Sequence, residues 1–156
     1  MNQQNLEQKC HCECGKTEFT IKGKPLMRMF CHCTICQEFN EADFSDVTIF
    51  LSKDVAFDQT QNIEFKQYKS PPAVDRGKCG YCHKPIIEFL NLPFFPSLTI
   101  IPSQNIEAGI YLPEACAHIF YHRRIEDIDD ELPKYSGFIN SQILLIKKLL
   151  SGMVGS

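Results

Sequence analysis

The sequence has no apolar run that approaches the roughly 20 residues a helix needs to cross a membrane. Its longest candidate, ILLIKKLL at 143–150, is interrupted by two lysines. The first ten residues, MNQQNLEQKC, are polar and have no apolar core of the kind found in a signal peptide. We therefore expect a cytoplasmic protein that does not insert into a membrane.

The sequence also lacks a large excess of charge of either sign. The formal net charge is −3 and no basic run occurs, which argues against a general nucleic-acid-binding role. The acidic run EDIDDE at 126–131 is typical of a solvated turn. Hydrophobic residues make up 44% of the 156-residue chain and charged residues 22%, as in a globular protein of one domain.

Cysteine, by contrast, is abundant. In a reducing compartment such a set indicates metal binding or catalysis before disulfides. The count is odd, and cysteines one residue apart would close a strained ring, so disulfides do not explain the set. The nine cysteines are Cys10, Cys12, Cys14, Cys31, Cys33, Cys36, Cys79, Cys82 and Cys116.

Short alternating segments predict a mostly antiparallel β domain. A loop is expected at 70–77, SPPAVDRG, because two prolines and a glycine lie in it. The expected strands are 16–22, 26–31, 47–52, 63–68, 85–91, 97–101 and 116–121.

The last segment predicts an amphipathic helix instead. In GFINSQILLIKKLL the apolar positions 139, 143, 146 and 150 keep helical spacing, and Leu149 broadens the stripe. We expect this helix to pack on the sheet or on a partner subunit, which would make a homo-oligomer. The predicted organisation is a disordered lead at 1–9, a zinc-binding domain at 10–137 and the helix at 138–156.

The first and third cysteine clusters predict a closed zinc site. CGYC at 79–82 supplies two sulfurs, and Gly80 allows the tight turn that such a pair needs. CHCECG at 10–15 supplies two more, either Cys10 with Cys12 or Cys12 with Cys14. Gly15 and the strand that follows favour Cys12 with Cys14, which leaves Cys10 as a spare thiol in a frayed segment.

The middle cluster, CHCTIC at 31–36, predicts a different site because it has three sulfurs and no obvious fourth ligand. A three-ligand zinc site leaves a position for water or substrate, and a thiol bound there would be deprotonated. A side chain from elsewhere could instead close the site and make it structural. The candidates for that role are His32, His83, His118 and Cys116.

Several motifs together resemble the glutathione-dependent formaldehyde-activating enzyme family, also called the centromere-protein-V type. They are CECGKTEF at 12–19, CHCTICQ at 31–37, DRGKCGYC at 75–82 and, less specifically, PEACAHIFYHRR at 113–124 and DDELPKYSG at 129–137. The resemblance implies a β-tent fold with two zinc ions per chain. It implies a structural zinc on Cys12, Cys14, Cys79 and Cys82, and a catalytic-type zinc on Cys31, Cys33 and Cys36.

The resemblance also implies a reaction. In the family a glutathione-type thiol adds to formaldehyde, and the reverse reaction places these enzymes among the carbon–sulfur lyases. We expect this activity here, with small thiols and aldehydes as partners and no organic cofactor. The chain departs from the family pattern at Gln37 and His83 and in having no tryptophan, which bears on the substrate site and leaves every metal ligand in place.

Two non-catalytic functions remain as alternatives. A binding or scaffolding module would have two structural zincs and use the C-terminal helix as its partner surface. A redox or zinc-buffer role would make Cys10 and the middle cluster easily oxidised.

Residues outside the clusters receive simpler interpretations. Cys116 and His118 are expected in the core, and Phe94 and Phe95 are expected to cap it. The stretch 122–124, HRR, could dock a glutathione carboxylate, although a solvated strand end is the simpler expectation.

Overall fold

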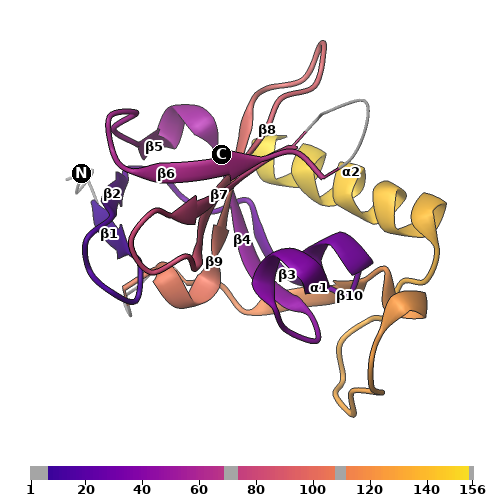
Figure 1. Ribbon diagram of the computed structural model, residues 1–156. Helices are drawn as coiled ribbons and strands as arrows, with labels where there is room; N and C mark the ends of the chain where they lie inside the picture. Colours follow the sequence, from indigo (N-terminus) through magenta and orange to yellow (C-terminus); the bar gives the residue numbers. More distant parts are fainter. Residues whose placement is uncertain (1–6, 69–73, 108–111, 155–156) are drawn as a thin grey trace.

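The computed structural model describes residues 7–68, 74–107 and 112–154, with side chains to residue 151. It is mostly β, with two sheets and a long C-terminal helix, as the sequence predicts (Figure 1). The smaller sheet has three strands in the order β1-β2-β5. They are β1 (Gln8–His11), β2 (Glu18–Ile21) and β5 (Val55–Ala56).

The larger sheet has seven strands in the order β10-β3-β4-β9-β8-β7-β6. All its neighbouring pairs are antiparallel except β10 and β3, which run parallel. Its strands are β3 (Met27–Cys31), β4 (Ser45–Leu51), β6 (Ile63–Lys66), β7 (Val74–Cys79), β8 (Pro85–Leu90), β9 (Leu98–Pro102) and β10 (Ala115–Ile119).

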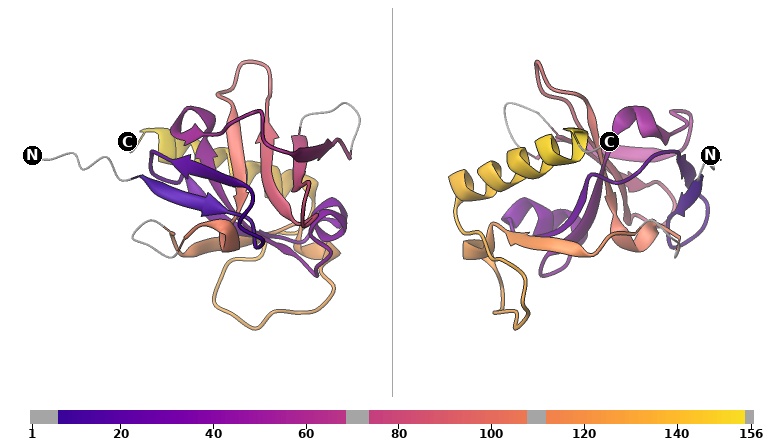
Figure 2. Two further views of the ribbon diagram at one scale, coloured as in Figure 1. Left: turned by 60° about the vertical axis from the view of Figure 1, so that its left-hand side comes forward. Right: turned by 180° about the vertical axis from the view of Figure 1, so that it is seen from behind.

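Helices connect or cover these strands. The α-helices are α1 (Thr34–Asn40) and α2 (Phe138–Val154), and the short 3₁₀ turns are η1 (Ser52–Asp54), η2 (Ser103–Asn105) and η3 (Tyr121–Arg123). Helix α2 lies on one side of the larger sheet and the smaller sheet lies on the other (Figures 1 and 2). No helix in the described part of the chain has the length and hydropathy to span a membrane.

The core lies in two layers because the larger sheet is covered on both faces. Strand β4 shows this directly: Ile49 packs in the layer under α2, whereas the next residue, Phe50, packs in the layer under the smaller sheet. A central strand buried on both faces carries apolar residues at successive positions, because alternate side chains point to opposite faces. Val47 and Ile101 extend the same arrangement on β4 and β9.

The structure corrects two boundaries that were predicted from sequence. Strand β7 begins at Val74, inside the segment 70–77 that was expected to be a loop, while residues 70–73 lie outside the described part. Strand β1 begins at Gln8, inside the expected lead, of which residues 1–6 lie outside the described part. In both cases backbone pairing with the neighbouring strands, β2 for β1 and β6 and β8 for β7, makes the strand where local periodicity does not indicate it.

Helix α2 is amphipathic, but its buried face differs from the expected one. Ile139, Ile143, Ile146 and Leu150 are 45–72% exposed, whereas Leu144 is 6% exposed and lies in the core layer beneath the helix. The helix carries apolar residues on both faces, so periodicity alone does not identify the packed one.

Candidate metal centres

Four cysteines from two distant turns converge at one edge of the molecule. The sulfurs of Cys12, Cys14, Cys79 and Cys82 all lie within 4.8 Å of one another. Cys12 and Cys14 lie in the turn between β1 and β2, Cys79 ends β7, and Cys82 lies in the turn to β8. The Cys12 and Cys14 sulfurs are 3.0 Å apart, and those of Cys14 and Cys79 are 3.8 Å apart. We call these four residues the first centre.

Hydrogen bonds hold the sulfurs of the first centre in place. The Thr17 hydroxyl donates to the Cys79 sulfur at 3.2 Å, and the Thr17 amide donates to the Cys12 sulfur at 3.4 Å. Burial favours the thiol form of Cys79, but the bonds from Thr17 and from the amides of Cys82 and Tyr81 outweigh it and lower its pKa to about 6. Donors aimed at a sulfur favour the thiolate, which is the form that binds metal.

Cys10 lies outside this centre. It is fully buried in β1, within the core layer under the smaller sheet, and not in a frayed segment as expected. Burial, with a smaller contribution from Glu107, raises the pKa of its thiol to about 12. The geometry therefore separates Cys10, a core residue, from Cys14, whose sulfur faces the other three.

Three further cysteines form the second centre. Cys31 ends β3, Cys33 is the N-cap of α1, and Cys36 lies in the first turns of that helix. Their sulfurs also lie within 4.8 Å of one another. The Cys33 sulfur accepts a hydrogen bond from the Cys36 amide at 3.3 Å, which satisfies one of the free amides at the helix start. Hydrogen bonds from Cys31 and Cys36 lower the pKa of Cys33 to about 3, against the effect of burial.

None of the four side chains named as candidates to close the second centre joins its sulfurs. Among the described residues, the metal-ligating groups that cluster there are the three cysteines and no others. His83 is exposed and lies 3.7 Å from Glu64, and Cys116 packs in the core layer under α2. His32 and His118 are buried and hydrogen-bonded to each other at 2.8 Å. Burial, followed by the charges of His118 and Arg124, lowers the pKa of His32 to about 4.

A partly buried cation lies beside the second centre, and sequence reasoning missed it. The Arg76 Nη1 atom is 3.9 Å from the Cys36 sulfur, and the same nitrogen forms an ion pair with Glu88. Glu88 is only 3% exposed, so burial raises its pKa to about 7 while the Arg76 guanidinium opposes that shift. The guanidinium also lies 5.8 Å from the centre of the Phe39 ring on α1.

Strand β7 connects the two centres. It carries Arg76 toward the second centre and, three residues later, Cys79 toward the first. Arg76 falls within the motif DRGKCGYC, of which the prediction from sequence used the two cysteines and Gly80 but not the arginine. The available signal was therefore an arginine three residues before Cys79, on the strand that carries this cysteine.

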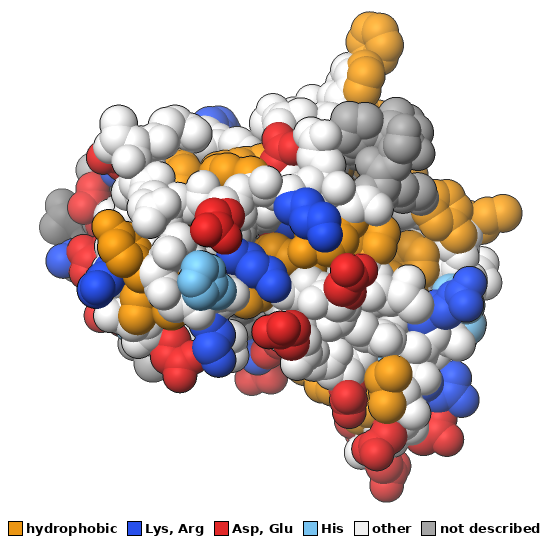
Figure 3. Space-filling view, in the orientation of Figure 1, with side chains coloured by type: hydrophobic (Ala, Val, Ile, Leu, Met, Phe, Trp, Pro, Cys, Tyr) orange, Lys and Arg blue, Asp and Glu red, His pale blue; other side chains and the backbone are white. Residues whose placement is uncertain are grey.

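The remaining sequence candidates are occupied or exposed. Arg124 pairs with Asp127, and His122 Nδ1 accepts a hydrogen bond from the Gly137 amide at 2.7 Å, so HRR is partly engaged within its own loop. Phe94 and Phe95 do not cap the core: they are fully and half exposed at the tip of the β8–β9 hairpin, where Figure 3 shows hydrophobic side chains projecting from the surface.

The donor sets suit zinc. Four sulfurs with no oxygen donor are typical of a closed structural zinc site, and three sulfurs leave one of the four tetrahedral positions to another ligand. The hydrogen bonds from Thr17 are of the kind that orients metal-bound sulfurs. The residues present therefore fit the ion that their spacing predicts.

Comparison with known proteins places these observations in a family. The family model described as glutathione-dependent formaldehyde-activating enzyme matches residues 7–123. A crystal structure of a Rhodobacter sphaeroides protein shares the fold, with a TM-score of 0.51 and 15% identity over 65% of this chain and 90% of that one. No curated protein sequence matches.

The matched segment spans three quarters of the chain and contains both cysteine centres. The protein therefore belongs to the glutathione-dependent formaldehyde-activating enzyme family.

Proposed function

We propose that this protein adds a glutathione-type thiol to a small aldehyde such as formaldehyde at the second centre, with zinc bound to Cys31, Cys33 and Cys36. The first centre, Cys12, Cys14, Cys79 and Cys82, would hold a structural zinc. The observation that carries the proposal is the difference between the centres: four sulfurs converge at one and three at the other. Family membership supports the choice of thiol and aldehyde.

The reaction needs no oxidant and no organic cofactor. The thiol sulfur forms a bond to the carbonyl carbon, the carbonyl π bond becomes a C–O single bond, and the thiol proton ends on that oxygen. The product is a hydroxymethyl thioether. Zinc at the second centre would supply a Lewis acid that favours the thiolate form of the incoming thiol.

The chain's own residues prepare this site in two ways. The N-cap geometry of Cys33 and the end of β3 bring three sulfurs together from a stretch of six residues. Arg76 holds a positive charge 3.9 Å from the Cys36 sulfur, and Glu88 keeps that guanidinium in place. A fixed cation favours negative charge on the sulfurs and on a ligand next to them.

The test combines metal content with product formation. We expect Cys36→Ser to lose the zinc of the second centre, glutathione to change only that centre, and two-dimensional exchange NMR to show hydroxymethylglutathione forming faster with wild type than with the variant. Cys116→Ser is the matched control, because Cys116 lies outside both centres. A fully zinc-loaded protein with no measurable affinity for glutathione would refute the proposal.

One observation favours a second candidate, a zinc-stabilised binding module with two structural zincs. The outer face of α2 exposes Ile139, Ile143, Ile146 and Leu150 at helical spacing, as a partner-binding helix would. Zinc in both centres that does not respond to glutathione, together with self-association that Ile143→Glu abolishes, would favour this function over the enzyme.

A further inference from the structure

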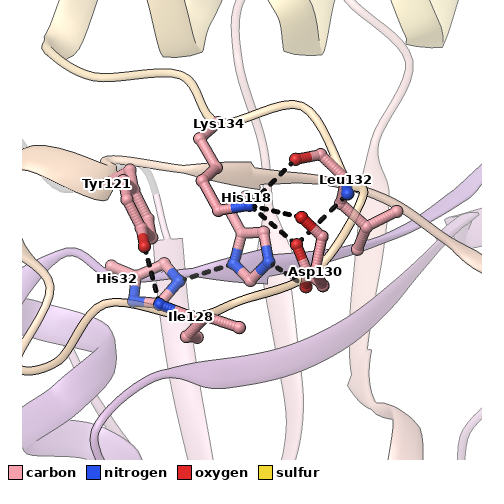
Figure 4. Close-up of polar contacts among 7 residues, drawn as sticks. All are labelled: His32, His118, Tyr121, Ile128, Asp130, Leu132 and Lys134. Carbon is pink, nitrogen blue, oxygen red and sulfur yellow. Dashed lines mark hydrogen bonds and ion pairs between the residues drawn. The ribbon is translucent and has the colours of Figure 1, made fainter.

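Two buried histidines and an aspartate form a hydrogen-bonded chain that begins between the ligands of the second centre (Figure 4). His32 Nε2 lies 2.8 Å from His118 Nδ1, and His118 Nε2 lies 2.7 Å from Asp130 Oδ2. The other carboxylate oxygen of Asp130 accepts a hydrogen bond from Lys134 at 2.8 Å. His32 is 1% exposed and His118 is fully buried. Asp130 belongs to the acidic run that the sequence presents as a solvated turn.

The chemistry of these groups gives the chain a direction. An ionised carboxylate only accepts hydrogen bonds, so the His118 Nε2 atom carries the hydrogen that is donated to Asp130. In a neutral ring the His118 Nδ1 atom then has a lone pair and accepts from His32 Nε2–H. The remaining ring nitrogen of His32, Nδ1, is buried and has no hydrogen-bond partner among the described residues. Within the described part of the chain, the bond to His118 is therefore the one polar contact that holds the His32 ring.

The backbone of His32 is held by the same part of the molecule. Its amide donates to the Ile119 carbonyl at 3.0 Å, next to His118 on β10. Its carbonyl accepts from Gln37 Nε2 at 2.7 Å, and that nitrogen also donates to the Arg123 carbonyl at 2.8 Å. The segment 118–134 thus holds the residue between Cys31 and Cys33 directly by its ring and its amide, and through Gln37 by its carbonyl.

Aromatic rings complete the surroundings of the two histidines. The centres of the Phe44 and Tyr121 rings lie 5.0 and 5.2 Å from that of His32. The Tyr121 hydroxyl accepts from the Ile128 amide at 2.8 Å, which fastens the loop that carries Asp130. Because these rings keep water away from the histidine hydrogen bonds, the bonds are electrostatically stronger than they would be at the surface.

We propose that His118 and Asp130 are positioning residues of the second centre. Through the His32 ring they fix the backbone that sets the separation of Cys31 and Cys33, so that three sulfurs are already arranged for a metal ion. The inference rests on the proposed function only in requiring that this centre binds zinc. Outer-shell partners of metal ligands typically change metal affinity by about 10–100-fold when they are removed.

The variant Asp130→Ala tests the proposal. The measurement is the transfer of zinc from the protein to a chromogenic chelator. Comparison with Cys36→Ser identifies which part of the released zinc comes from the second centre. We expect Asp130→Ala to weaken zinc binding at the second centre about tenfold and to leave the first unchanged. Asp130→Asn keeps an oxygen that can accept from His118 and should restore most of the loss. Asp127→Ala is the matched control, since Asp127 lies in the same loop but pairs with Arg124.

A further control separates the histidine chain from loop stability. Lys134→Met removes the other ionic partner of Asp130 and keeps the bond to His118. If this variant weakens the second centre as much as Asp130→Ala does, the loop and not the histidine chain is responsible, and the proposal is wrong.

Substitution of His118 supplies a spectroscopic test on cobalt-loaded protein. Asn places a side-chain oxygen near the position of the ring's Nδ1 and can still accept from His32, whereas Leu cannot. We expect His118→Asn to keep the visible cobalt–thiolate spectrum of the second centre and His118→Leu to alter it. Identical spectra in both variants and the wild type would contradict the proposal.

The outcomes distinguish this inference from the proposed function. Zinc that binds the second centre and is weakened by Asp130→Ala, without any affinity for glutathione, upholds the positioning role and refutes the reaction. Zinc that binds equally in wild type and Asp130→Ala refutes the positioning role alone. A second centre that binds no metal in the wild type refutes both.

Discussion

Cys10 and Cys14 are the same kind of residue four positions apart, yet they occupy opposite environments. Cys10 is fully buried among apolar side chains of one core layer, and Cys14 is exposed with its sulfur 3.0 Å from that of Cys12. Cys10 faces the core because side chains alternate between the two faces of β1, whereas Cys14 lies in the turn that follows this strand. A thiol in the core acts as a small apolar group, and one at the turn is available to a metal ion.

Substitution of these two cysteines should therefore have different results. Cys14→Ser should remove about one equivalent of zinc from the chain, because a four-sulfur site loses a ligand. Cys10→Ser should leave zinc content unchanged and lower the free energy of unfolding by about 1–3 kcal/mol, because a hydroxyl is buried in an apolar layer. Elemental analysis and urea denaturation measure the two effects, and zinc loss in Cys10→Ser would contradict the assignment.

Asp130 gives the molecule a specific dependence on acid. The hydrogen bonds from Lys134 and His118 lower its pKa to about 2, below the value near 3.9 of an unfolded chain. A depressed carboxyl pKa stabilises the fold above the unfolded value, and that stabilisation is lost as pH falls through the folded one. The Tm difference between wild type and Asp130→Asn should be largest at pH 5 and vanish toward pH 2. A constant difference would mean that this carboxylate's charge is irrelevant.

At the scale of elements, β7 and α2 show how context overrides local pattern. Strand β7 forms in a stretch next to two prolines because it pairs with β6 on one side and β8 on the other. Gly77 is required there, since a Cβ would lie 2.8 Å from side-chain atoms of both Ile63 and Phe65. Helix α2 has two apolar faces and buries the one that contains Leu144.

The two faces of α2 should respond differently to truncation. Leu144→Ala should destabilise the protein by about 2–5 kcal/mol, because it removes a buried side chain and leaves a cavity. Ile146→Ala, at a position 45% exposed, should change stability by no more than about 0.5 kcal/mol. Chemical denaturation of zinc-saturated protein measures both. Equal losses would indicate that the outer face is covered, as in a dimer.

At the scale of the whole molecule, the first centre joins the two sheets. Cys12 and Cys14 belong to the turn of the smaller sheet, whereas Cys79 ends β7 of the larger sheet and Cys82 lies in the turn after it. The core layer under the smaller sheet contains two of these cysteines, Cys12 and Cys79, among its buried members. Metal binding at this point would close long loops of chain and so contribute to folding directly.

Removal of metal should therefore loosen the smaller sheet first. A ligand at a hundredfold excess over its Kd stabilises the folded state by about 2.7 kcal/mol, which corresponds to about 5–10 °C in Tm for a chain of this size. We expect chelation to lower Tm by at least that amount. Hydrogen exchange should accelerate in β1 and β2 more than in β3 and β4. Uniform acceleration in all four strands would contradict the local role of the first centre.

The sequence by itself determined the cysteine clusters, the mostly β fold and the family. Each of these depends on local information: ligand spacing of one or two residues, period-two alternation, and short motifs in a fixed order. The sequence also suggested a four-sulfur set and a three-sulfur set, but it left open whether another side chain joins the three, and the structure shows the two sets. For the same reason the sequence favoured Cys14 over Cys10, since Gly15 marks the turn that brings the second sulfur round.

Only the tertiary structure decided which distant groups meet. His32 and His118 are 86 positions apart, and no periodicity connects them or links either to an aspartate in an acidic turn. Arg76 reaches Cys36 because β7 lies beside α1 in space, and α2 buries Leu144 because of the surface that it meets. Contacts across the fold arise from strand order and layer packing, which short-range sequence patterns do not record.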